Sequence, residues 1–168
     1  MTASSTPLLD GIEPPRGGPV RRIRVYAVRE RSTSERPRLS SPREVWQLLA
    51  GDVAGWDRER FLTLALDSAN RLIGIETVST GTLNATTVHP REIFKGLILA
   101  NAAAFIAVHN HPSGQVKPSA EDREVTKRLA EAGDLLGIRL LDHVVLSADA
   151  FHSFADCGEM PSTGGPRR

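Results

Sequence analysis

Residues 102–122 read AAAFIAVHNHPSGQVKPSAED, and this stretch predicts three successive elements of the fold. The small apolar run from Ala102 to Val108 indicates a buried strand. Two prolines and a glycine then turn the chain, and the acidic segment that follows Ser119 is typical of a helix start. A buried strand that leads through a loop into a helix is characteristic of a mixed α/β domain.

Two histidines, His109 and His111, stand at the end of the predicted strand. Alternate residues of a strand point to the same side, so we expect both imidazoles on one side, at the mouth of the loop. Asp122 follows in the first turn of the predicted helix. Two imidazoles and one carboxylate would leave the fourth position of a tetrahedral Zn²⁺ ion open to water, as in catalytic zinc sites.

Ser119 and Asp122 also fit a purely structural interpretation. A serine before a helix can be its N-cap, and an acidic residue three positions later can complete a capping box. The histidine pair has no comparable explanation, because His-x-His gains nothing in strand packing. Spacing alone therefore leaves both a metal site and a helix cap open.

The motif resembles the JAMM motif of MPN/JAB-domain metalloproteins: His109, one residue, His111, seven residues, Ser119, two residues and Asp122. Further segments resemble the RadC-like branch of that superfamily, over roughly residues 43–158. These segments are Phe61–Asp67, Asn70–Glu76, Gly81–Asn84, His89–Glu92, His109–Gly114, Thr126–Leu129 and Leu141–His143.

The resemblance implies a single MPN/JAB-like domain of the α/β class, similar to the cytidine-deaminase fold, with a mixed central sheet flanked by helices. It implies a zinc ion bound by His109, His111 and Asp122. It further implies that the Ser119 hydroxyl donates a hydrogen bond to the oxyanion that develops during hydrolysis.

Members of the family also carry a glutamate that takes a proton from the attacking water. Glu59 lies just before the predicted strand 61–67, where the family places this glutamate, and we assign it as the catalytic carboxylate. Glu76, in the partner strand of the predicted hairpin, is the alternative.

The reaction that the resemblance implies is zinc-dependent hydrolysis of an amide bond in a peptide or isopeptide, with a peptide or protein as substrate. The alternative is a non-catalytic binding module stabilised by the metal and associated with DNA repair or a mobile element. A zinc deaminase is excluded because it needs a Pro-Cys-x-x-Cys segment, and the chain has one cysteine, Cys157. A two-metal nuclease is disfavoured because such enzymes use clusters of carboxylates.

Charge is distributed unevenly along the 168 residues. Residues 16–43 hold nine arginines and two glutamates, whereas the remainder is mildly acidic. We expect a basic, largely flexible leader over residues 1–40, the domain over 41–158, and a flexible tail over 159–168. The leader could contact nucleic acid or simply be solvated. We expect no helix-hairpin-helix DNA-binding segment in it, although longer members of the family carry one.

No apolar run is long enough for a transmembrane helix, and the first residues lack the pattern of a secretory signal. A single cysteine fits a reducing compartment, so we expect a cytoplasmic protein with no membrane partner. The sequence leaves the oligomeric state open.

The remaining elements follow from periodicity and end signals. We expect strands at 20–28, 61–67, 72–79 and 139–146, and helices at 42–51, from residue 90, and at 119–132 with Gly133 as C-cap. His89 is expected at a helix start, and Phe151 and Phe154 are expected to dock the C-terminal segment. His143 is expected to be hydrogen-bonded and partly buried; it or Asp142 could orient a metal ligand.

Overall fold

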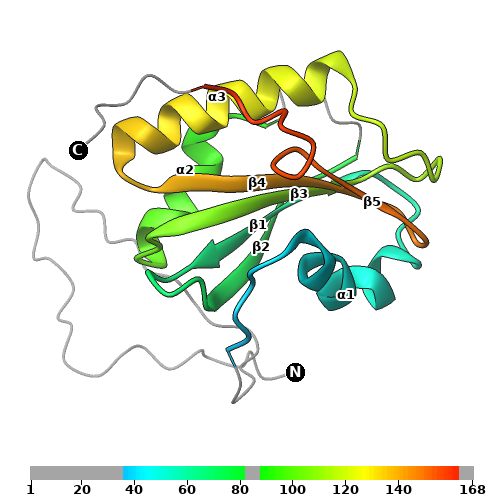
Figure 1. The fold of residues 1–168 in the computed structure, drawn as a ribbon, viewed down its shortest axis with the longest axis horizontal. Helices are drawn as coiled ribbons and strands as arrows, with labels where there is room; N and C mark the ends of the chain where they lie inside the picture. Colours follow the sequence, from blue (N-terminus) through cyan, green and yellow to red (C-terminus); the bar gives the residue numbers. More distant parts are fainter. Residues whose placement is uncertain (1–35, 82–87, 163–168) are drawn as a thin grey trace, which may run out of the picture.

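The structure is a computed structural model that describes residues 36–81 and 88–162. The predicted strand 20–28, the loop expected at 84–87 and most of the basic leader lie outside these residues. The described residues form one sheet with helices on both of its faces (Figure 1). None of the helices in the described ranges is both long and apolar enough to cross a bilayer.

The described residues form three helices and five strands. The helices are α1 (Pro42–Val53), α2 (Pro90–Leu99) and α3 (Ala120–Leu136). The strands are β1 (Arg60–Leu66), β2 (Leu72–Thr80), β3 (Ala104–Asn110), β4 (Arg139–Leu146) and β5 (Phe151–Ser153).

The strands are arranged in the order β2-β1-β3-β4-β5. β1 pairs antiparallel with both β2 and β3, whereas β3 and β4 are parallel and are connected through α3. A parallel pair needs such a crossover because its second strand must start again from the same edge. The mixed sheet flanked by helices confirms the predicted fold class.

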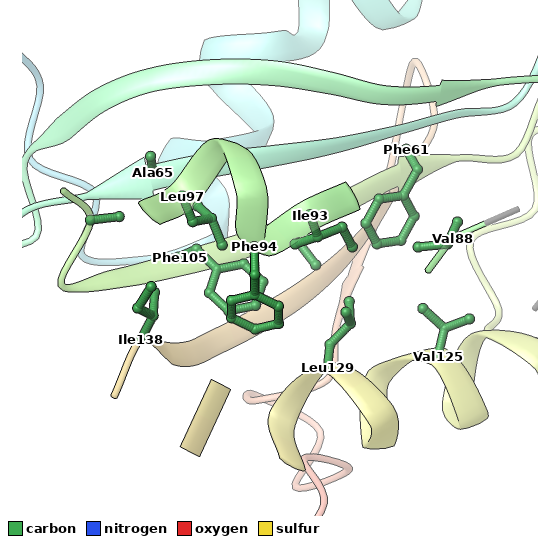
Figure 2. Packing of buried hydrophobic residues seen from close by; sticks show 12 residues of the cluster. Phe61, Ala65, Val88, Ile93, Phe94, Leu97, Phe105, Val125, Leu129 and Ile138 are labelled. Carbon is green, nitrogen blue, oxygen red and sulfur yellow. The ribbon is translucent and has the colours of Figure 1, made fainter. Parts of the chain in front are cut away.

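Almost all of β1 is buried, and its successive side chains point alternately into two cores on opposite faces of the sheet. Leu62 and Leu64 face α1, while Phe61 faces the opposite side, which α2 and α3 cover. Figure 2 shows the second core, where Phe105 of β3 packs against α2 and Leu129 of α3. Every residue of β3 is buried, because helices cover both faces of this central strand.

The predicted helix starts are confirmed. Ser41 caps α1 through a capping box with Glu44, and the His89 ring caps α2 by accepting a hydrogen bond from the Arg91 amide. Both α1 and α2 have proline in the first turn, where no amide donor is needed.

The predicted end of α3 is wrong by one turn. Gly133 lies inside the helix, which continues to Leu136 and ends at Gly137 with φ of 72°. A Cβ on Gly133 would lie 2.5 Å from the carbonyl oxygen of Ile138, so glycine permits the close return of the chain toward β4. The helix-terminating glycine signal belongs to Gly137 instead. α1 likewise runs two residues past the expected stop at Gly51.

Candidate metal centre

The two histidines and Asp122 meet where β3 ends and α3 begins. His109 is the penultimate residue of β3, His111 follows that strand, and Asp122 lies in the first turn of α3. The side chain of His109 is fully buried, whereas that of His111 is 15% exposed. The expectation that both rings lie at the mouth of a loop is therefore wrong for His109. Its ring stacks on Phe61 beneath the helical layer.

The distances among the three candidate ligands suit one metal ion. The Nε2 atoms of His109 and His111 are 3.1 Å apart, and Oδ1 of Asp122 is 3.2 Å from Nε2 of His109. Zinc–nitrogen bonds in tetrahedral geometry give ligand separations of about 3.3 Å. Within the described residues, this is the group of histidine, cysteine and acidic side chains able to hold a metal ion. The residues present therefore fit the implied ion.

The loop after β3 orients the His111 ring. Its Nδ1 donates to the carbonyl oxygen of Gln115 at 2.6 Å. Gly114 turns the loop with φ of 78°, as predicted, and its amide donates to the His111 carbonyl at 3.0 Å. Because Nδ1 carries the proton, Nε2 of His111 presents its lone pair to the other candidate ligands.

Ser119 and Asp122 form the capping box that was predicted as the structural alternative. The amide and hydroxyl of Ser119 donate to Oδ2 of Asp122 at 2.7 and 2.8 Å, and the Asp122 amide donates to Ser119 Oγ at 3.1 Å. The cap thus occupies Oδ2 and leaves Oδ1 nearest His109. The two interpretations are compatible, because one carboxylate can cap the helix and present its other oxygen to a metal. Donation by Ser119 to an oxyanion stays a prediction.

Opposite effects act on the charge of Asp122. Burial disfavours its ionised form, but contacts with the ring nitrogens of His109 and His111 outweigh burial and hold the pKa of Asp122 well below its ordinary value. The pKa of His111 is raised, chiefly by its contact with Asp122, against the effect of burial. The charge of Glu59 contributes to the same shift. Asp122 is therefore ionised and available as a ligand at neutral pH.

The two candidate glutamates lie in different surroundings. Glu59 immediately precedes β1, whose Phe61 pairs with His109, and its negative charge acts on His111. Glu76 lies on the edge strand β2 against α2, where a Cβ on Gly96 would be 1.7 Å from its Oε2 atom. Partial burial raises the pKa of Glu76. Of the two carboxylates, the structure thus brings Glu59 to the His111 side of the site.

A third histidine, His143, contacts the buried side of His109. The sequence predicted that it or Asp142 could orient a metal ligand. His143 of β4 is hydrogen-bonded, as expected, but it is fully rather than partly buried, and its Nε2 lies 2.8 Å from Nδ1 of His109. Burial lowers the pKa of His143 well below its ordinary value, so the ring is neutral. Asp142 points elsewhere and accepts hydrogen bonds from Ser153 Oγ and the Ala155 amide.

Thr126 is the neighbour of the site that sequence analysis missed. Its Oγ1 lies 2.6 Å from Nδ1 of His143 and donates to the carbonyl of Asp122, also at 2.6 Å. Its spacing of four residues from Asp122 places both on one face of α3, which is the signal that could have identified it.

A mixed α/β domain with two histidines and an aspartate converging at the end of its central strand defines a candidate single-metal protein. Residues 39–159 match the model of the RadC-like JAB domain family, and the chain belongs to that family.

The chain is similar to bacterial proteins that bear the name UPF0758. It is 52% identical to the one from Rubrobacter xylanophilus over 116 residues, which are 69% of this chain and 51% of that protein. It is 47% identical to the one from Desulforudis audaxviator over 117 residues, 70% of this chain and 51% of that protein. The relative from Desulforamulus reducens is 43% identical over 148 residues, 84% of this chain and 65% of that protein. The matched part of this chain thus spans about half the length of the first two relatives.

Proposed function

We propose that this protein is a zinc-dependent hydrolase of the JAMM type that cleaves a peptide or isopeptide bond in the cytoplasm. The observation that carries the proposal is the convergence of two imidazole Nε2 atoms and one carboxylate oxygen at 3.1 and 3.2 Å. His109, His111 and Asp122 would hold the ion. When bound, zinc supplies a Lewis acid and lowers the pKa of water toward the neutral range.

The roles of the remaining residues follow from their positions. Glu59 takes the proton from the attacking water and returns it to the leaving amine. Its position two residues before Phe61, which pairs with His109, supports this assignment over Glu76, which packs against α2. The Ser119 hydroxyl donates a hydrogen bond to the oxyanion. To do so, it gives up the hydrogen bond that it donates to Asp122.

Metal content tests the first part of the proposal. The purified wild-type protein is expected to hold one zinc ion per chain by elemental analysis, and His109→Ala and His111→Ala are expected to hold none. His152→Ala is the matched control, because His152 lies on β5 beside Glu159 and outside the three-residue group. Stoichiometric zinc in both site variants would refute the assigned ligands.

Hydrolysis tests the second part. With a quenched-fluorescent peptide library as probe, Glu59→Gln is expected to keep its zinc and lose cleavage by at least about 100-fold, as for loss of a general base. Glu76→Gln is the matched control and should cleave like wild type. Loss of activity in Glu76→Gln alone would reassign the base. Zinc binding without cleavage by the wild-type protein would favour the metal-stabilised binding module.

A further inference from the structure

The hydrogen bonds around His143 have fixed directions, because Thr126 and the His143 ring have few protons to donate. Thr126 has one hydroxyl proton, and the Asp122 carbonyl 2.6 Å away can only accept. The hydroxyl proton therefore lies between Thr126 and that carbonyl, in the back-bonding pattern that threonine adopts in helices. An oxygen pair this close would repel without a proton between them.

The His143 ring must then act as a donor at one nitrogen and an acceptor at the other. Its Nδ1 lies 2.6 Å from Thr126 Oγ1, whose proton is already committed, so Nδ1 carries the ring proton. The ring is 0% exposed and lies between Phe61 and Phe154, at centroid distances of 5.5 and 5.0 Å. An apolar enclosure of this kind disfavours a charged imidazolium, so Nε2 carries a lone pair.

The contact with His143 in turn fixes the tautomer of the candidate ligand His109. Nδ1 of His109 lies 2.8 Å from the accepting Nε2 of His143, so His109 carries its proton on Nδ1. Its Nε2 therefore presents a lone pair to Oδ1 of Asp122 and Nε2 of His111. Since the Gln115 carbonyl sets the same tautomer in His111, three acceptor atoms converge, and a metal cation between them would satisfy all three.

We propose that Thr126 and His143 are positioning residues whose hydrogen-bond relay holds His109 in the metal-binding tautomer. The relay begins at the backbone of Asp122 and ends at the ring of His109, so it ties one candidate ligand to another across α3, β4 and β3. It deepens the proposed function and rests on it, because the relay concerns affinity for the same metal ion. Partners behind a ligating histidine typically change metal affinity by about 10- to 100-fold.

Removal of the threonine hydroxyl should reverse the relay. In Thr126→Val, Nδ1 of His143 loses its acceptor, so the His143 proton is better placed on Nε2, where it donates to His109. His109 then carries its own proton on Nε2 and donates to Asp122 Oδ1, which leaves no lone pair for zinc. Thr126→Ser retains the hydroxyl and should restore what Thr126→Val loses. Thr63→Val, a change of the same kind at a buried threonine of β1, is the control for general packing effects.

Two measurements test the relay. Ring-nitrogen NMR correlations of the metal-free wild-type protein at pH 8 should show His109 protonated on Nδ1, and those of Thr126→Val should show it protonated on Nε2. Competition titration with a zinc chelator should show an affinity about 10- to 100-fold lower for Thr126→Val, recovered in Thr126→Ser and unaffected in Thr63→Val.

Failure of the proposed function and failure of the relay alone give different results. Wild-type protein that takes up no zinc refutes the proposed function together with the role of the relay in it. Wild-type protein that binds zinc but carries the His109 proton on Nε2 refutes the relay alone. Equal zinc affinities for Thr126→Val and Thr126→Ser, in folded proteins, also refute the relay alone.

Discussion

At the scale of single residues, Ser119 and Asp122 serve a structural purpose whether or not a metal is bound. Oδ2 of Asp122 accepts hydrogen bonds from both the amide and the hydroxyl of Ser119. These two bonds fix the carboxylate so that Oδ1 lies 3.2 Å from Nε2 of His109. The helix cap therefore also orients a candidate ligand. A capping residue replaced by alanine typically costs about 0.5–2 kcal/mol of stability.

The chain offers a matched pair to separate capping from ligand orientation. Ser41→Ala and Ser119→Ala each remove the serine of a capping box, so each should lower the free energy of unfolding by about 1 kcal/mol in urea titrations. Ser119→Ala should in addition weaken zinc binding, because Asp122 loses the hydroxyl bond to Oδ2, one of the two bonds that fix its carboxylate. Equal zinc affinities in the two variants would contradict the second role of Ser119.

At the scale of elements, two helical glycines of α2 and α3 face different neighbours. A Cβ on Gly133 would meet the backbone oxygen of Ile138 at 2.5 Å, whereas a Cβ on Gly96 would meet the flexible end of the Glu76 side chain. The backbone at Ile138 is held in the connection to β4, so it cannot move aside as the Glu76 side chain can. α3 therefore approaches the start of β4 at a distance that only glycine allows.

Alanine substitution should separate these two glycines. Gly96→Ala gains helix propensity, and Glu76 can rotate away, so the stability should be unchanged or up to about 1 kcal/mol higher. Gly133→Ala gains the same propensity but forces the backbone apart, so we expect a net loss of about 1–3 kcal/mol. Urea denaturation of both variants measures the difference. Equal midpoints would show that the connection after α3 relaxes easily.

At the scale of the whole molecule, the candidate ligands join the sheet to the helical layer. His109 and His111 lie at the end of β3 and just after it, and Asp122 belongs to α3. This helix covers one face of the sheet, together with α2 (Figure 1). A bound ion would therefore cross-link two layers and favour the folded state. A ligand at 100 times its dissociation constant adds about 2.7 kcal/mol to the stability of the state that binds it.

Metal removal should consequently lower the melting temperature. Calorimetry of the zinc-loaded protein before and after treatment with a chelator is expected to show a decrease of several degrees, since about 1 kcal/mol corresponds to roughly 2–8 °C in domains of this size. His109→Ala should melt at one temperature with or without chelator. A chelator effect of equal size in that variant would place the stabilising zinc elsewhere.

Much of this architecture is local in origin and was predictable from the sequence. The apolar run before His109 predicted the central strand, the serine before an acidic turn predicted the capping box of α3, and the spacing to Asp122 predicted the candidate ligands. Such features depend on residues within a few positions of one another. Periodicity and end signals therefore indicate them before any tertiary contact is known.

The contacts between distant segments depend on strand register and on how α2 and α3 cover the sheet. These determine that Glu59 rather than Glu76 lies on the His111 side, and that His109 is buried. They also bring Thr126 and His143 together behind His109. No local pattern specifies these meetings, because each joins side chains whose proximity arises only when separate elements pack on one another.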